Sequence, residues 1–143
     1  MSVPQAFPNL NATNHEVTSP PTSEYNCIAW AAEDDERWWW PIPESVTYWP
    51  KGVPRATTQE AFIGAFATLG YAPCDSGELE HGFDKVVLYA DTNNVPTHMA
   101  RQLQDGAWTS KLGKSNDISH STPDVVDGPL YGRAQVFLKR LRA

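Results

Sequence analysis

The feature that most constrains the fold is a run of apolar and β-branched residues followed by two further strand-like segments. Residues 85–90 read Lys-Val-Val-Leu-Tyr-Ala, which predicts a central β-strand. Residues 97–103 and 107–112 flank Gln-Asp-Gly at 104–106, where glycine suits the left-handed position of a three-residue hairpin loop. The second half of the chain is therefore predicted to form an antiparallel sheet, with a weaker strand signal at 135–141.

Two helices are predicted ahead of this sheet. The first covers residues 27–32, with Ser23 or Asn26 as its N-cap. The second begins at the capping-box pattern of residues 57–60 and continues to Leu69, because apolar residues recur at helical intervals over that stretch. Helices followed by an antiparallel meander predict an α+β domain.

The remaining segments are predicted to be irregular. Residues 1–23 are rich in Asn, Pro, Ser and Thr, which predicts an extended N-terminal arm, either laid over the domain or mobile, with a single domain over 24–143. The aromatic-rich stretch 38–50 contains prolines that exclude regular helix or central strand, so it is predicted to be a loop covering the core. Residues 71–84 are predicted as a loop or ragged strand, and 116–117 as the cap of a short turn.

Charge and composition exclude several classes of function. A formal net charge of −6 argues against nucleic acid or an anionic membrane as the partner. No apolar run approaches the roughly 20 residues of a membrane span, and no signal peptide is recognisable, which predicts a cytoplasmic protein or export by a signal-independent route. The two cysteines and four histidines lack metal-ligand spacing, so no metal or cofactor is expected.

Cys27 and His98 are the candidate catalytic residues. A cysteine in the first turn of a helix becomes a nucleophile when an imidazolium also stabilises its thiolate. His98 follows Pro96 at the start of a predicted strand, where a rigid element would position it against the helix. We therefore predict a thiolate–imidazolium pair. The structural alternatives are a small apolar core residue at Cys27 and a surface histidine at His98.

The order of these residues resembles that of papain-like cysteine enzymes, most closely the compact bacterial cell-wall endopeptidases, over roughly residues 25–112. The resemblance implies a papain-like α+β fold with helices packed on a small antiparallel sheet. It also implies a cysteine hydrolase or acyl-transfer enzyme acting on an amide or peptide bond, in which Cys27 attacks and His98 carries the proton. A peptide or protein substrate is expected, and for a bacterial toxin or effector the partner would be an inhibitor or immunity protein.

Two residues compete for the third catalytic position. A three-residue hairpin loop pairs Ala100 with Ser110 and places Ser110 on the side of His98, whereas a two-residue turn would place Thr109 and Lys111 there. Papain-like enzymes usually hold Asn, Asp, Gln or His at this position. Asp117 would orient the ring better if its loop folds back. Both Ser110 and Asp117 therefore remain candidates.

A second resemblance supplies no activity. The phrases YNCIAWA, YWP, THxARQL, WTSKLG and DIxH occur here in order and are similar to an uncharacterised bacterial domain family. Two other functions therefore stay open: a non-catalytic binding domain whose contact surface is the Trp-rich loop, and a redox-sensing thiol in which Cys74 resolves oxidised Cys27. His120, Arg101 and Lys111 are expected to be surface residues. The alternatives are that Arg101 and Lys111 hold a substrate carboxylate and that His120 contacts the site.

Overall fold

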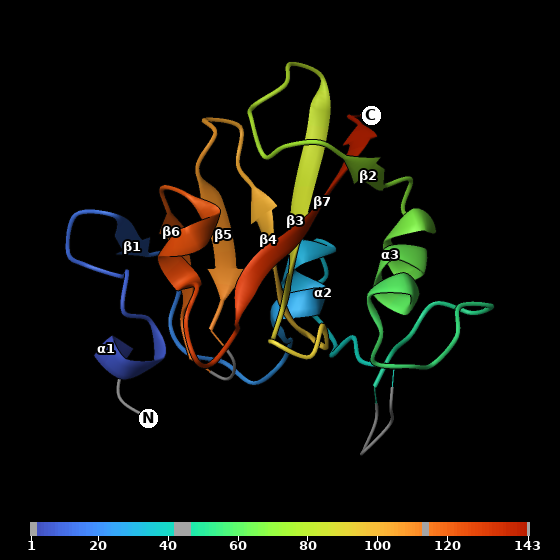
Figure 1. The fold of residues 1–143 in the computed structure, drawn as a ribbon, viewed down its shortest axis with the longest axis horizontal. Coiled ribbons are helices and arrows are strands. Elements are labelled where there is room, and N and C mark those ends of the chain that lie inside the picture. The colour runs from blue at the N-terminus through green and yellow to red at the C-terminus, as the bar shows by residue number, and fades with distance from the viewer. Residues whose placement is uncertain (1–2, 42–46, 113–114, 143) are drawn as a thin grey trace.

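The computed structural model describes residues 3–41, 47–112 and 115–142, and within them seven antiparallel strands form one sheet. The strand order is β1-β6-β5-β4-β3-β7-β2 (Figure 1). The strands are β1 His15–Val17, β2 Ala72–Cys74, β3 Phe83–Ala90, β4 Pro96–Gln102, β5 Trp108–Lys111, β6 Asp117–His120 and β7 Arg133–Leu141. The helices are α1 Val3–Ala6, α2 Cys27–Ala31, α3 Gln59–Ala67 and the 3-10 helix η1 Pro123–Val126.

The predicted mixture of helices and an antiparallel sheet is confirmed, although the sheet dominates. β3 is the predicted central strand, paired with β4 on one side and β7 on the other. The hairpin register places Arg101 opposite Thr109, and Gly106 adopts a φ of +93°, as a left-handed loop position requires. Both predicted helices and the C-terminal strand are present.

Alternating side chains of β3 divide the interior into two cores. Val86 and Leu88 lie on the face covered by α2 and α3, which we call the helical face. Val87 and Tyr89 lie on the other face, which η1 and the N-terminal arm cover and which we call the arm face. Because successive strand residues point to opposite faces, a residue on β4 or β5 belongs to one core or the other and never to both.

The Trp-rich segment covers the helical face, as predicted. Trp39 and Trp49 are buried, and their rings contact Phe66 and Phe62 of α3 at centroid distances of 6.0 and 5.1 Å. Residues 42–46 of the predicted loop lie outside the described residues. The aromatic side chains of this segment therefore contribute to the core.

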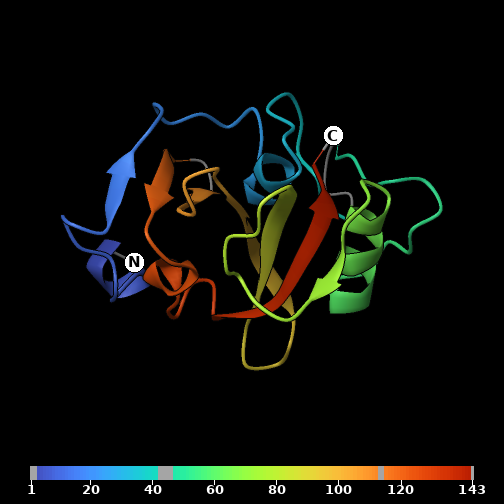
Figure 2. The ribbon, with the colours of Figure 1, turned by 90° about the horizontal axis from the view of Figure 1, so that it is seen from above.

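The N-terminal arm lies over the domain, one of the two arrangements expected for it, and adds a strand to the sheet. β1 pairs with β6 along one edge of the sheet, at the end opposite α3 (Figures 1 and 2). Phe7 is buried against Tyr131 with ring centroids 5.3 Å apart, and the Asn9 side chain donates to the carbonyl of Asp124 at 2.8 Å. These contacts, which local sequence patterns do not encode, complete the arm face.

One further segment differs from the prediction, and another takes one of the two forms predicted for it, a short strand within a loop. Asp117 begins β6 and does not cap a turn, because β6 is paired on both sides by β5 and β1. Ala72–Cys74 forms the edge strand β2 against β7 despite Pro73. Proline is tolerated at an edge because one side of such a strand needs no hydrogen-bond donor.

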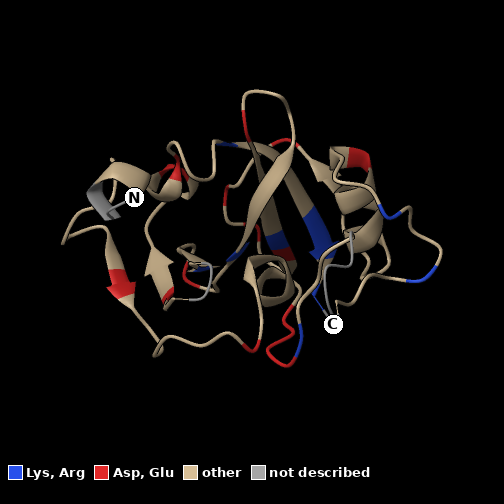
Figure 3. Cartoon of the chain, turned by 90° about the horizontal axis from the view of Figure 1, so that it is seen from below, with Lys and Arg blue, Asp and Glu red and all other residues tan. Residues whose placement is uncertain are grey.

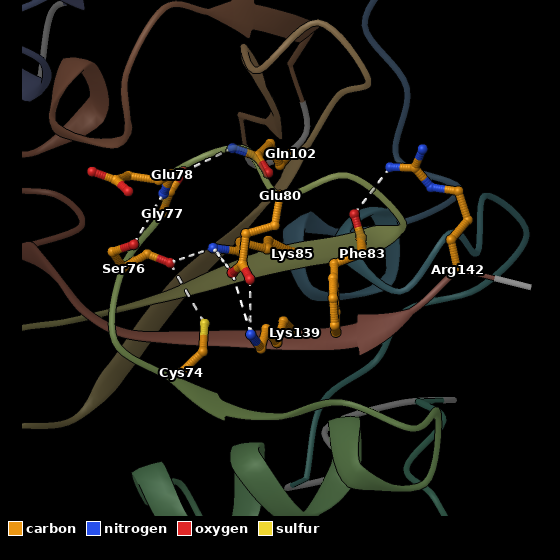
Figure 4. A network of polar contacts seen from close by, with 10 residues as sticks. All are labelled: Cys74, Ser76, Gly77, Glu78, Glu80, Phe83, Lys85, Gln102, Lys139 and Arg142. Carbon is orange, nitrogen blue, oxygen red and sulfur yellow. Dashed lines mark hydrogen bonds and ion pairs between the residues drawn. The ribbon is translucent and has the colours of Figure 1, made fainter.

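The segment between β2 and β3 crosses the arm face and is held there by ionic and polar contacts (Figure 4). Lys85 is buried, and its ammonium lies 2.6 Å from Glu80 and donates to the carbonyl of Ser76 at 2.9 Å. Lys139 contacts the same carboxylate at 3.0 Å. A Cβ added to Gly77 would lie 2.6 Å from a ring carbon of Phe137, so only glycine lets the backbone approach this closely.

Asn26 fixes the start of α2. Its Oδ1 accepts from the backbone N–H of Ala29 at 3.1 Å and from that of Trp39 at 3.0 Å, while its Nδ2 donates to the carbonyl of Trp39 at 2.8 Å. Of the two predicted caps, Asn26 is therefore the one used. One side chain both begins the helix and ties it to the Trp-rich segment.

Replacing Asn26 by Ala should destabilise the protein more than the same change at Thr58, which caps α3 through one bond to Ala61. We expect a loss of about 2–4 kcal/mol for Asn26→Ala and about 1 kcal/mol for Thr58→Ala. Urea unfolding of both variants measures the difference. Equal losses would mean that the two bonds to Trp39 contribute no net stability.

Candidate functional site

Cys27 lies on the helical face as the first residue of α2 and is 8% exposed. Burial raises the pKa of its thiol to about 11, against smaller opposing effects of the backbone N–H groups of Met99 and Ile28 and of the Lys111 ammonium. Its surroundings therefore favour a protonated, neutral thiol at pH 7. Two conditions are predicted to stabilise the thiolate of Cys27. Cys27 does begin a helix, but no imidazolium lies beside it.

His98 lies on the arm face and does not meet Cys27. It is opposite Tyr89 in the register of β3 and β4, and its ring stacks on Tyr131 with centroids 3.9 Å apart and planes 7° apart. Met99, the next residue along β4, shares the core of Cys27. Since neighbouring strand residues point to opposite faces, His98 is directed away from the thiol. The predicted thiolate–imidazolium pair is therefore not formed.

Ser110 does face His98, as the three-residue hairpin loop predicts. Its hydroxyl oxygen lies 2.9 Å from His98 Nε2 and 2.8 Å from His120 Nε2. His120 Nδ1 lies 2.8 Å from the carbonyl oxygen of Thr122. The expectation of a surface position for His120 is wrong, because β6 directs this side chain into the arm face, where it is 1% exposed.

The proton positions in this chain follow from its last member. The Thr122 carbonyl can only accept, so His120 Nδ1 must donate and the neutral ring accepts at Nε2. Ser110 then gives its one hydroxyl proton to His120 and accepts from His98 Nε2. His98 Nδ1 is left without a proton, and it has no hydrogen-bond partner among the described residues. Burial lowers the pKa of both imidazoles, most strongly that of His98.

Asp117, the rival of Ser110, lies on the side of Cys27. It accepts from the Tyr25 hydroxyl at 2.5 Å and from the Ser19 hydroxyl at 2.7 Å. Lys111 is opposite Asp117 in the register of β5 and β6 and donates to the carbonyl of Ser115. Lys111 is completely buried, so its expected surface position is wrong. These polar contacts tie the segment before α2 to β6.

A cavity of about 620 Å³ lies at one end of the helical face, where β4 and β7 end near the turn after α2. Figure 3 shows basic residues of the C-terminal strand near acidic residues of that turn. The cavity is lined by Glu33, Leu69, Asp84, Arg101, Gln102, Leu103, Gln104, Arg140, Leu141 and Arg142. Three guanidinium groups and two carboxylates give its wall a net positive charge in a chain whose net charge is −6.

Of these three guanidinium groups, that of Arg101 has the fewest hydrogen-bond partners. Its Nε is buried and has no hydrogen-bond partner in the described part of the chain, and its closest carboxylate oxygen, from Glu33, is 4.0 Å from NH1. The guanidinium carbon lies 5.5 Å from the ring centroid of Trp30. The sequence indicated only a short basic tail at 139–142, and nothing local predicted that Arg101 would join it.

Cys27 should react more slowly than Cys74 with iodoacetamide at pH 7. A pKa of about 11 leaves about one thiol in ten thousand ionised, and Cys74 is more exposed. Mass spectrometry of the native protein, with Cys27→Ser and Cys74→Ser as references, measures each rate. Faster labelling at Cys27 would contradict the burial of its thiol and would support the hypothesis that this thiol is activated.

The free energy of unfolding should fall as the pH falls below about 6.5. Both buried imidazoles have a folded pKa below the ordinary value of 6.5, so the unfolded chain binds more protons in that range. We expect a loss of about 2 kcal/mol between pH 7.5 and 5, measured by urea unfolding. His98→Gln should flatten this dependence and His81→Gln, at an exposed position, should not. If wild type, His98→Gln and His81→Gln lost stability equally as the pH fell, the loss would not come from the buried ring of His98.

Comparison with known proteins identifies a family without an assigned activity. Among the described residues, no helix has the length and apolar character needed to cross a bilayer, and no group of three or more His, Cys, Asp or Glu side chains is arranged to hold a metal ion. Searches of curated proteins and of solved structures found no match. Residues 16–139 match the family described as Domain of unknown function (DUF7689). The chain belongs to this family.

Proposed function

We propose that this domain is a non-catalytic binding domain whose ligand carries a negative charge, and that the ligand site is the arginine-lined cavity. The observation that supports the proposal is the state of Arg101: a partly buried guanidinium, 20% exposed, whose Nε has no hydrogen-bond partner among the described residues. A buried donor without an acceptor is costly, and an anion supplies the acceptor. The volume of about 620 Å³ suits a small ligand or one end of a larger one.

This site replaces the Trp-rich loop as the proposed contact surface. Trp39 and Trp49 are buried, and Trp40 and Tyr48 are partly buried against the same core, so little of this aromatic surface is available to a partner. The cavity, by contrast, opens at the end of the sheet and carries a charge opposite to that of the whole chain. An acidic protein that binds an anion needs such a local excess of positive charge.

A papain-like cysteine enzyme acting on an amide or peptide bond is the second candidate. One observation favours it: Cys27 is the first residue of α2, and backbone N–H groups of Ile28 and Met99 lower the pKa of its thiol. In such an enzyme Lys111, and not His98, would be the cation nearest the sulfur. Against this candidate stands the raised thiol pKa of about 11. Labelling of Cys27 as fast as that of an exposed thiol would favour the enzyme.

The binding proposal predicts that Arg101→Gln abolishes stabilisation by anions. Wild-type protein should show a higher Tm in sodium acetate than in sodium chloride at the same ionic strength, and each 1 kcal/mol of binding corresponds to about 3 °C. Lys51→Gln is the matched control, because it removes one positive charge from an exposed position outside the cavity. An equal response in the two variants would mean that the anions act through general charge and not at Arg101.

A further inference from the structure

Arg140 and Arg142 already donate several hydrogen bonds within the chain, so Arg101 is the guanidinium with the most donors left for a ligand. Arg140 donates through Nε to Asp84, through NH1 to the carbonyl of Leu69 and through NH2 to Glu33. Arg142 donates through Nε to Asp84 and through NH2 to the carbonyl of Phe83. These bonds hold two guanidinium groups in place without calling on a ligand.

The carboxylate of Glu33 lies at the entrance of the arginine-lined cavity. One oxygen lies 2.7 Å from Arg140 NH2 and the other 4.0 Å from Arg101 NH1, so the carboxylate reaches toward both cations. Its backbone has a φ of +64°, an uncommon value for a residue other than glycine, at the point where the chain leaves α2. The side chain is half exposed and can therefore move aside.

The charge of the cavity favours a singly charged ligand group. Asp84 and Glu33 offset two of the three guanidinium charges, so the lining has one positive charge in excess. A carboxylate matches that excess and presents two oxygens in one plane to a guanidinium. A phosphate dianion would bring a second charge that the lining does not balance while Glu33 is in place.

Apolar side chains line the same cavity beside Arg101. Leu69 and Leu103 are only half buried there, so part of their apolar surface remains open to a ligand. An aliphatic group joined to the bound carboxylate would cover these leucines. The cavity thus offers one charged and one apolar wall to the same ligand.

Resting on the proposed anion-binding function, we propose that the cavity binds a carboxylate joined to an aliphatic group, and that Glu33 competes with that carboxylate for Arg101 and Arg140. Because of this competition, Glu33 lowers the affinity of the cavity for its ligand. Removing its charge without changing its shape, as in Glu33→Gln, leaves the arginines in place and frees them for the ligand.

The test is a titration followed by NMR, with N-acetyl-leucine, its neutral analogue N-acetyl-leucinamide, acetate and inorganic phosphate as probes. N-acetyl-leucine should bind about tenfold more tightly than acetate, the gain expected from covering apolar surface. N-acetyl-leucinamide and phosphate should not saturate the site. Glu33→Gln should bind N-acetyl-leucine about fivefold more tightly, which corresponds to the loss of one competing surface ion pair.

Variants at Arg101 complete the experiment. Arg101→Gln should weaken binding of N-acetyl-leucine at least about tenfold, and Arg101→Lys should restore only part of the loss because lysine lacks the planar pair of donors. Lys51→Gln is the charge-matched control and should bind as wild type does. Circular dichroism confirms that each variant is folded.

The outcomes separate this inference from the function on which it rests. Phosphate binding at Arg101 without N-acetyl-leucine binding would overturn the carboxylate assignment and leave an anion-binding domain. Equal affinity for acetate and N-acetyl-leucine would overturn the apolar requirement, and unchanged affinity in Glu33→Gln would overturn the competition. Failure of all four probes to bind wild type and Glu33→Gln would overturn the proposed function as well.

Discussion

The rest of the structure depends on the burial of β3 on both faces. Val86 and Leu88 point to the core beneath α2 and α3, while Val87 and Tyr89 point to the core closed by η1 and the arm. Burying four large side chains of one strand in two directions requires that both faces be covered. The Trp-rich segment and α3 cover one face, and the N-terminal arm and the segment at 75–82 cover the other.

This two-sided burial also determines which polar residues meet. The helical face collects Tyr25, Lys111 and Asp117 near Cys27, and the arm face collects the chain of His98, Ser110 and His120. Each group is almost entirely buried, and most of its polar atoms are hydrogen-bonded. Such networks fix the pairing of strands because a misplaced strand would leave buried donors and acceptors unpaired. Their first role in this fold is therefore structural.

The arginine cavity differs from both networks because it lies at the end of the sheet, where strands leave the cores. β4, β7 and the turn after α2 come together there, and the side chains can no longer all find partners within the chain. Loops and strand ends placed on a rigid sheet are common positions for binding sites. His98 Nδ1 and Asp117 Oδ1 in the interior also lack a partner among the described residues, but Arg101 is the unpaired group that carries a positive charge and lines a cavity.

The sequence by itself determined the elements: the central strand at 85–90, the hairpin with Gly106 at its left-handed position, both main helices and the side of β5 on which Ser110 lies. These depend on local periodicity and loop length, which neighbouring residues encode. Only the tertiary structure decided that Cys27 and His98 are separated by the sheet, that the arm adds a strand, and that Arg101 joins Arg140. Those outcomes depend on which face of the sheet each helix covers, and no local pattern specifies that choice.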